Sequence, residues 1–291
     1  MRVGCDLPYF ADPGETRAFA AAAEELGFHH LGFAEHVAAS RTTAFPAGFS
    51  FDDPWHESST LLGFLAAATD SIELVTATHL ATLRHPVLVA KQAAEADLLS
   101  GGRLRLGVSV GWNREEQRAL SQDPATRAGR LEEAVPLLRR LWSDDAVTHD
   151  GRYFHLDAVG IHPRPGRVIP IWMGAGALGG GGRPTAAALR RAARLADGFK
   201  LMAPTGLDVG GALRIIQHLH DLAVRAGRTI AIEARLLTQV TPPDEWAAVL
   251  RRYRHSGLVS HVGLGNRVAG GGVDAQIAHV REVVERTRDE W

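Results

Sequence analysis

Two kinds of hydrophobic pattern alternate along the chain. Short, nearly continuous apolar runs are typical of buried strands, and longer stretches with apolar residues three or four positions apart are typical of amphipathic helices. Strands are predicted at Val3–Leu7, His30–Ala34, Ile72–Thr78, Leu104–Val110, Ile169–Met173, Gly198–Met202, Ile230–Gln239 and His261–Leu264. Helices are predicted at Thr16–Leu26, Ser58–Thr69, Pro86–Leu99, Asn113–Leu120, Arg127–Trp142, Thr185–Leu195, Val209–Ala226, Glu245–His255 and Asp274–Arg288.

The order of these elements predicts an α/β fold. Strictly alternating strand–helix units form a parallel sheet, and eight of them closing on themselves form a (β/α)8 TIM barrel. A doubly wound open sheet is the alternative that the same alternation allows. A turn signal at Asp150–Gly151 predicts a short hairpin excursion after the fourth strand. Because no linker or repeat divides the chain, residues 1–291 are expected to form a single TIM-barrel domain.

Composition and charge narrow the classes of function. The chain of 291 residues has a formal net charge of -1, so it lacks the positive charge that is typical of nucleic-acid binding. Cys5 is the only cysteine, which excludes an internal disulfide and favours a buried structural thiol. The N-terminus lacks the apolar segment of a signal peptide, and no apolar run reaches the ~18 residues of a membrane span. We expect a cytoplasmic protein that binds neither nucleic acid nor membrane.

The segment "GVSVG" at residues 107–111 matches the G-x-S-x-G pattern of serine hydrolases. A nucleophile elbow requires a sharp strand-to-helix turn at the serine itself. Ser109 instead lies within one apolar run, and the bend is expected later, at Gly111–Asn113. Asn113 is a predicted N-cap, and Glu116 is in position to complete a capping box. We therefore interpret Ser109 as a strand residue.

In a TIM barrel the active site lies at the C-terminal ends of the strands, and this rule selects candidate residues. Glu35 and His36 stand together at the tip of the second predicted strand. A histidine can donate, accept or shuttle a proton near neutral pH, so His36 is the candidate for proton transfer. The alternative is that His36 caps a loop by hydrogen bonding.

A glycine-rich segment, "MGAGALGGGG", follows the fifth predicted strand. It contains a G-x-G-x-x-G match, but a dinucleotide fingerprint opens a helix at once, and here the helix starts only at Pro184–Thr185. Glycines allow backbone N–H groups to approach an anion, so Gly174–Gly176 form a candidate phosphate site. Gly179–Gly182 are interpreted as a flexible loop. Gly111–Asn113 offer a second anion-friendly helix start, with Trp112 as a flat apolar wall.

The fourteen histidines of the chain raise the question of a metal site. His218 and His220 share a predicted helix, but a spacing of two directs them to different faces. The sequence contains neither an H-E-x-x-H motif nor a tight cluster of Asp, Glu and His with ligand spacing. We expect no metal site.

At these candidate residues the sequence resembles the bacterial luciferase-like monooxygenase family, and within it the oxidoreductases that depend on the deazaflavin coenzyme F-420. The resemblance runs from Met1 to about Leu201, and the last third agrees mainly in pattern. It implies a (β/α)8 barrel that holds a flavin or deazaflavin ring in its mouth. The stretches that carry it are "AAAEELGFHHLGFAEH", "LRHPVLVAKQAAEADLLSGGRLRLGVSVGWNREE", "RAGRLEEAVPLLRRLW", "GRYFHL" and "RRAARLADGF".

The resemblance also implies roles for single residues. It places His36 beside the cofactor ring as proton donor or acceptor, with Glu35 orienting or tuning it. The segment Thr76, Ala77 and Thr78 matches a strand tip that often carries a cis peptide behind the ring, so a cis bond is expected at Ala77–Thr78. The segments that hold the cofactor phosphate and tail match Gly111, Trp112, Asn113, Gly174, Ala175 and Gly176.

Three positions depart from the family pattern. Trp112 stands where the sugar-phosphate dehydrogenases of the family place a glutamate acid, which argues against that substrate. The acidic residue before the histidine is Glu35, where the family more often has aspartate. The segment Leu178–Thr185 is longer than expected, which would reshape the tail pocket.

The function implied by the resemblance is hydride transfer between coenzyme F-420 and a small organic substrate, with residues 37–56 as part of the substrate wall or lid. An FMN-dependent monooxygenase that uses reduced flavin and O2 is the alternative on the same scaffold. A non-catalytic flavin-binding protein and a hydrolase using Ser109 are alternatives from other classes. The expected partners are the small-molecule substrate, a separate cofactor reductase and a second copy of the chain in a homodimer.

Overall fold

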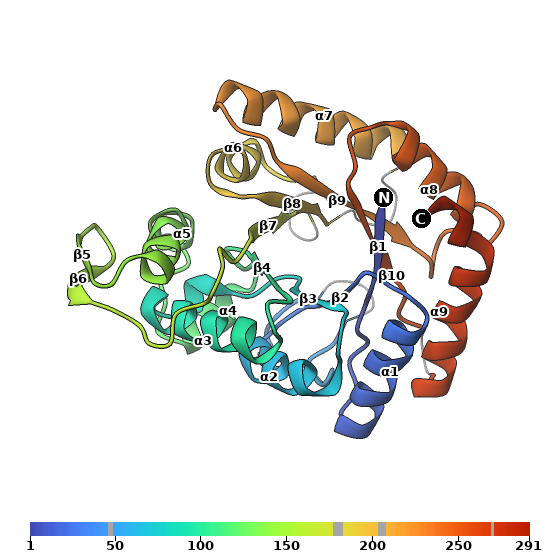
Figure 1. Ribbon diagram of the computed structural model, residues 1–291, viewed down its shortest axis with the longest axis horizontal. Coiled ribbons are helices and arrows are strands. Elements are labelled where there is room, and N and C mark those ends of the chain that lie inside the picture. Colours follow the sequence, from blue (N-terminus) through green and yellow to red (C-terminus); the bar gives the residue numbers. More distant parts are fainter. Residues whose placement is uncertain (46–48, 177–182, 203–207, 269–270) are drawn as a thin grey trace.

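Eight parallel strands close into a barrel in this computed structural model of the protein (Figure 1). The structure describes residues 1–45, 49–176, 183–202, 208–268 and 271–291. The barrel strands follow one another in chain order, and the last pairs with the first, which confirms the (β/α)8 barrel and excludes an open sheet. They are β1 (Arg2–Asp6), β2 (His30–Phe33), β3 (Glu73–Thr76), β4 (Leu104–Val108), β7 (Ile171–Ala175), β8 (Gly198–Leu201), β9 (Ala231–Leu237) and β10 (His261–Gly265).

Helices cover the outside of the barrel, whereas the short helix Arg114–Ala119 lies at its rim, where Glu116 is bonded to His36. Local signals set their starts: α1 begins at Pro13 after the N-cap Asp12, whose carboxylate accepts the Gly14 N–H at 2.7 Å. The helices are α1 (Pro13–Glu25), α2 (Ser58–Ala68), α3 (Pro86–Leu99), α4 (Arg114–Ala119), α5 (Arg127–Ser143), α6 (Ala186–Leu195), α7 (Val209–Arg225), α8 (Trp246–His255) and α9 (Val273–Thr287), with short 3-10 turns η1 (Ala81–Leu83) and η2 (Arg288–Glu290).

The strand predicted over Ile72–Thr78 is shorter in the structure, where β3 ends at Thr76. At that residue the side-chain hydroxyl takes over the bonding to the neighbouring strand, because Thr76 Oγ1 accepts the Gly107 N–H at 2.9 Å. The same hydroxyl donates to the Gly107 carbonyl at 2.8 Å. The backbone beyond Thr76 is therefore released from the regular ladder and can form the rim of the barrel.

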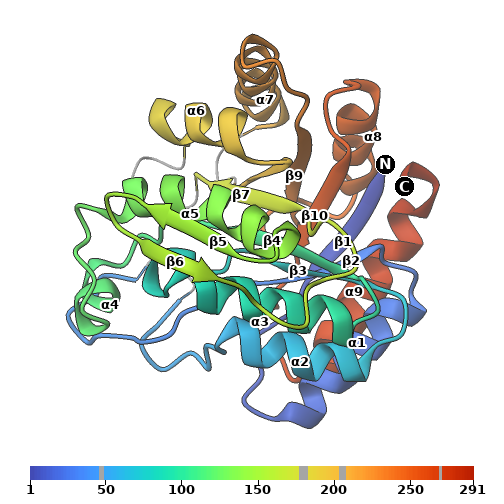
Figure 2. The ribbon, with the colours of Figure 1, turned by 60° about the vertical axis from the view of Figure 1, so that its left-hand side comes forward.

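The predicted excursion between the fourth and fifth barrel strands is confirmed as an antiparallel hairpin, β5 (Val147–Asp150) and β6 (His155–Val159). It lies on the outside of the molecule, beside α5 (Figure 2). Glu133 on α5 holds it there, because its carboxylate accepts the backbone N–H groups of Tyr153 at 3.1 Å and Phe154 at 2.9 Å. The hairpin therefore belongs to the outer layer and takes no part in closing the barrel.

The centre of the barrel is polar, which the apolar strand patterns did not predict. Glu233 on β9 is fully buried and pairs with Lys200 on β8 at 2.9 Å and with Arg105 on β4 at 3.0 Å. Burial raises the pKa of the Glu233 carboxyl, but Lys200, His30 and Arg105 outweigh it and hold the pKa well below its ordinary value. Gly263 makes room for this cluster, since a Cβ there would lie 2.5 Å from Glu233 Oε1.

Aliphatic and aromatic side chains fill the layer between the strands and the helices. Cys5 lies in this core as a buried free thiol, as predicted, and burial raises the pKa of that thiol well above its ordinary value. Of the helices that the structure describes, none combines the length and the apolar character needed to cross a bilayer.

Candidate active site

The candidate residues gather at one end of the barrel. Each lies at or just after the C-terminal end of a strand, where TIM-barrel enzymes carry their chemistry. The four strands concerned are consecutive neighbours in the sheet, so their ends form one arc. The arc consists of Glu35 and His36 after β2, Thr76, Ala77 and Thr78 at the end of β3, Gly111, Trp112 and Asn113 after β4, and Gly174, Ala175 and Gly176 at the end of β7.

His36 is held by a carboxylate from a distant element. Its Nδ1 lies 2.9 Å from Oε2 of Glu116, a buried residue of α4. The other oxygen of Glu116 accepts the backbone N–H of Val37 at 2.6 Å and of Ala38 at 3.2 Å. Because a carboxylate only accepts hydrogen bonds, this contact places the proton on Nδ1. No described residue is hydrogen-bonded to Nε2 of His36, which leaves that atom for proton exchange with a substrate.

Glu35 does not orient His36 through a hydrogen bond, and the alternative that it tunes His36 stays a prediction. The Glu35 carboxylate accepts hydrogen bonds from the Ser58 hydroxyl at 3.0 Å and from Arg84 at 2.6 Å. Burial raises the pKa of Glu35, but His79 and Arg84 outweigh it, so that the pKa lies below its ordinary value. Glu35 instead faces the cation of Arg84 and the donors at the start of α2, whereas the His36 imidazole faces Glu116 on α4, so the two consecutive residues join different networks.

The end of β3 carries the expected cis peptide at Ala77–Thr78. Thr78 Oγ1 donates a hydrogen bond to Ser109 Oγ at 2.6 Å. The Ser109 backbone continues the strand pairing, since its N–H donates to the His79 carbonyl at 3.1 Å. The chain therefore does not turn sharply at Ser109, and its hydroxyl is engaged with Thr78, which rules out the nucleophile elbow.

Gly174 lies directly against Thr78 on the same rim. A Cβ at position 174 would lie 2.7 Å from Thr78 Cγ2, so a side chain there would displace the threonine. Gly176 has a φ of 109°, which strongly favours glycine. Gly179–Gly182 lie outside the described residues, as does much of Leu178–Thr185, and the expectations for them stay predictions.

The start of α4 corrects two expectations. Asn113 is the N-cap, as predicted, and its Oδ1 accepts the N–H groups of Glu115 at 3.1 Å and Glu116 at 3.3 Å. Because the cap occupies these amides, this short helix does not offer them to a phosphate. Glu116 does not complete a capping box, since its carboxylate bonds His36 and the loop behind it. Trp112 remains beside His36, with ring centroids 5.5 Å apart.

Comparison with family models identifies the family of this barrel. The family model described as "Luciferase-like monooxygenase" matches residues 1–287. The chain belongs to the luciferase-like monooxygenase family. The resemblance inferred from the sequence is thereby confirmed at the level of the family.

Curated relatives of this luciferase-like chain include F-420-dependent glucose-6-phosphate dehydrogenases. The one from Kineococcus radiotolerans is 30% identical over 207 residues, which cover 68% of this chain and 55% of the relative. An uncharacterised protein of Mycobacterium bovis is 30% identical over 233 residues, which cover 75% of this chain and 78% of the relative. The chain spans about half the length of the first of these dehydrogenases.

Solved structures share the luciferase-like fold along the whole chain. Monooxygenase RslO1 from Streptomyces bottropensis superposes with a TM-score of 0.77 at 21% identity, covering 99% of both chains. An F-420-dependent secondary alcohol dehydrogenase in complex with an F-420-acetone adduct superposes with a TM-score of 0.74 at 17% identity, again covering 99% of both. At such identities the likeness concerns the fold alone.

The sequence patterns do not identify three residues of the luciferase-like site: Arg84, Glu116 and Trp55. The pattern around Glu116 predicts a helix cap, although a glutamate at the same rim as His36 is also a signal for a partner. Trp55, whose ring centroid lies 4.5 Å from that of His36, belongs to the segment predicted to wall the substrate. Among the described residues, no group of three or more His, Cys, Asp or Glu is arranged to hold a metal ion.

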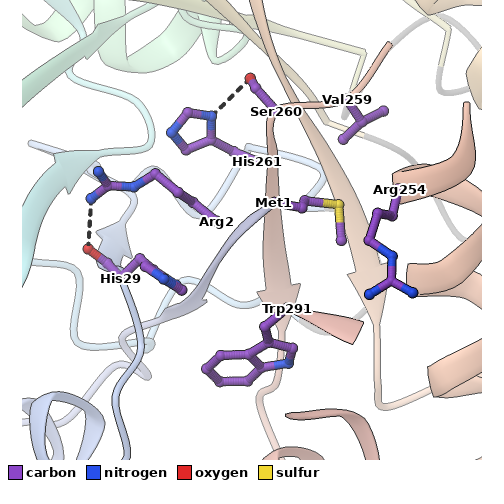
Figure 3. Close-up of a pocket in the computed structure, with 8 residues that line it drawn as sticks. All are labelled: Met1, Arg2, His29, Arg254, Val259, Ser260, His261 and Trp291. Carbon is purple, nitrogen blue, oxygen red and sulfur yellow. Dashed lines mark hydrogen bonds between the residues drawn. The ribbon is translucent and has the colours of Figure 1, made fainter. Parts of the chain in front are cut away.

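At the opposite end of the barrel lies a separate hollow of about 610 Å³ (Figure 3). Arg2 donates to the His29 carbonyl there at 3.3 Å, and the His261 ring is bonded to Ser260 at 2.9 Å. These residues stand at the N-terminal ends of β1, β2 and β10, the face of a TIM barrel that serves stability. The hollow is therefore no part of the candidate active site. Its lining is Met1, Arg2, His29, Arg254, Val259, Ser260, His261 and Trp291.

Proposed function

We propose that this protein is an oxidoreductase that transfers hydride between coenzyme F-420 and a small organic substrate. The observation that carries the proposal is His36, which Glu116 holds at Nδ1 at 2.9 Å while Nε2 is left for the proton that accompanies a hydride. The relatives named as F-420-dependent dehydrogenases support the choice of cofactor.

The residues at the strand ends fit a flat cofactor with a polar edge. Gly174 presents backbone without a side chain next to Thr78, and Gly176 follows it with a positive φ. A planar ring and its phosphate can approach such a surface closely. Two buried polar atoms of α4 and its cap, Nδ2 of Asn113 and Oε1 of Gln117, have no hydrogen-bond partner among the described residues. Buried polar groups normally find partners, and the edge of a deazaflavin offers both donors and acceptors.

The protein's own residues would transfer the proton, position the histidine and hold the cofactor. When bound, the cofactor supplies the hydride acceptor or donor. His36 takes up or returns the accompanying proton at Nε2, and Glu116 keeps the proton on Nδ1. Glu35 holds the rim together through Arg84. The segments that would hold the cofactor are Thr76, Ala77 and Thr78 behind the ring, Gly111, Trp112 and Asn113 at its edge, and Gly174, Ala175 and Gly176 at the phosphate.

A binding titration tests the proposal. Purified protein is titrated with F-420 and with FMN, each oxidised and reduced, and binding is followed by fluorescence. Binding of F-420 in clear preference to FMN is the expected result. Preference for reduced FMN would replace the proposal with the FMN-dependent monooxygenase, and binding of neither would overturn a redox function altogether.

A further inference from the structure

We propose, resting on the function proposed above, that the substrate is a flat, uncharged aromatic alcohol or its ketone and not a phosphorylated sugar. The feature that carries this inference is an aromatic surface beside His36, here called the aromatic wall. Its members come from the loops after β1, β2 and β4. They are Tyr9, Phe45, Phe49, Trp55 and Trp112.

The aromatic wall is continuous with the imidazole of His36. Trp55 and Trp112 meet His36 edge to face, with centroid distances of 4.5 and 5.5 Å and interplanar angles of 79° and 81°. Trp55 continues to Tyr9 at 4.3 Å and to Phe49 at 5.4 Å, where the two planes are only 29° apart. Such ring surfaces stabilise planar apolar molecules through stacked and edge-to-face contacts.

The aromatic wall is not ordinary core packing. Phe49 is 36% exposed, and Trp55 and Trp112 are only partly buried. Apolar side chains gathered at the C-terminal rim of a TIM barrel stand where ligands bind. Their exposure next to His36 therefore indicates a surface that a ligand covers.

One buried donor in the aromatic wall lacks a partner. Nε1 of Trp55 is inaccessible to solvent and has no hydrogen-bond partner among the described residues. Other indoles of the chain are satisfied: Nε1 of Trp142 donates to the Ala90 carbonyl at 3.0 Å, and Nε1 of Trp246 donates to the Thr241 carbonyl at 2.9 Å. An indole N–H can only donate, so the missing partner is an acceptor such as a hydroxyl or carbonyl oxygen.

Several cations around the aromatic wall and in the barrel beneath it are already neutralised. Arg267, which lies over the Tyr9 ring, pairs with Asp53 at 2.9 Å. Arg235 pairs with Asp6, and Lys200 shares the same carboxylate at 3.3 Å. Tight recognition of a phosphate draws on arginine or lysine groups that can form charge-assisted hydrogen bonds to it. These three charges are committed to carboxylates, and Arg41 of the neighbouring loop is stacked over the Phe51 ring at 4.3 Å, which favours an uncharged substrate.

In the proposed oxidation, the electron pair passes to the cofactor and the proton passes to His36. Oxidation of the alcohol breaks the C–H bond of the carbinol carbon, and its electron pair leaves as hydride to oxidised F-420. The hydroxyl proton passes to Nε2 of His36, and the C–O bond becomes a carbonyl. The ketone oxygen is an acceptor of the kind that the N–H of Trp55 lacks among the described residues.

The decisive experiment measures dissociation constants on F-420-loaded protein with matched probes. Acetophenone and cyclohexyl methyl ketone have the same carbon number but differ in flatness, and glucose 6-phosphate represents the charged alternative. We expect acetophenone to bind about threefold or more tighter than the cyclohexyl ketone, and glucose 6-phosphate to bind weakest. Equal or tighter binding of glucose 6-phosphate, or no preference for the flat ketone, overturns the inference. Failure of F-420 itself to bind would instead overturn the proposed function.

Variants locate the binding to the aromatic wall. Trp55→Leu and Phe49→Leu should each weaken acetophenone binding about threefold or more, whereas Trp55→Phe retains the ring and tests the donor alone. Phe64→Leu is the matched control, because Phe64 lies on α2, outside the segment expected to wall the substrate, and its ring is covered by Arg17 at 5.4 Å. F-420 affinity should be unchanged in Phe49→Leu, which separates a substrate contact from a folding defect. Acetophenone binding that survives both leucine variants would overturn the inference.

Discussion

Two buried glutamates of the candidate active site, Glu35 and Glu116, have partners of different kinds. Glu35 is bonded to Arg84 at 2.6 Å, a cation that does not release its proton. Glu116 is bonded to His36 at 2.9 Å, a side chain that can both donate and accept a proton. One carboxylate thus belongs to a permanent ion pair, and the other to a group that can change its charge.

The difference separates a structural role from a chemical one. Glu35, at the end of β2, holds two neighbouring segments. It accepts the Ser58 N–H at the N-terminus of α2 and, at 2.7 Å, the Leu80 N–H in the turn after β3. Glu116 fixes one imidazole nitrogen and leaves the other unbonded among the described residues. A substitution in the first network should therefore lower stability, and a substitution in the second should lower turnover.

The largest expected effect on turnover is that of His36→Ala. Loss of the group that exchanges the proton should lower kcat by about 10²–10⁴-fold, while F-420 affinity stays within about tenfold, or roughly 1.4 kcal/mol. Steady-state kinetics and a cofactor titration measure the two quantities separately. His155→Ala, at an exposed site on β6, is the matched control and should keep full activity. Turnover that survives in His36→Ala would reduce His36 to a structural residue.

Glu35→Gln should have the largest effect on stability. The substitution removes the charge facing Arg84, and breaking a buried ion pair from one side costs about 3 kcal/mol. Thermal or denaturant unfolding at neutral pH measures the loss. Glu57→Gln is a useful comparison, because Glu57 also pairs with Arg84 at 2.6 Å but is 32% exposed, so its loss should be smaller. Equal losses in the two variants would contradict the assignment of Glu35 as the anchor.

The barrel itself could be predicted because each strand and helix carries its own local pattern. The helix Pro86–Leu99 begins and ends as predicted, since its signals, a proline at the start and glycines after the end, are local. The rule that TIM-barrel sites lie at the strand ends selected His36. Family resemblance added the cis bond at Ala77–Thr78, which the structure confirms.

The partners of these residues could not be predicted, because they depend on how the barrel closes. Glu116 lies 80 positions after His36, and no local pattern links them. In the barrel centre, Glu233 meets Arg105 across 128 positions, although each strand had been interpreted as an apolar run. The partner of a charged residue in a short strand can therefore be predicted only when the strands that face it across the barrel are known.

A smaller effect on turnover is expected from Glu116→Gln. A glutamine can present its N–H₂ to Nδ1, which would force the neutral imidazole to carry its proton on Nε2 instead. Because a hydrogen bond to a charged group contributes about 1.5–3 kcal/mol, kcat should fall by roughly ten- to a hundredfold. The pH profile of kcat should change as well, which a merely structural role would not require. Glu115→Gln, next along α4, is the control and should leave both unchanged.

The smallest expected effect, and the one that isolates the charge of Glu35, is a pH dependence of stability. Its folded pKa lies below the ordinary 4.5, so the carboxylate contributes stability that is fully present above about pH 4.5 and is lost as the pH falls through the folded pKa. In Glu35→Gln this contribution is absent at every pH. The gap in unfolding midpoint between the wild-type protein and Glu35→Gln should therefore be wide at pH 7 and narrow progressively below pH 4.5. A gap of constant width would mean that the variant acts through packing, and that the ion pair with Arg84 is not what holds this side of the rim.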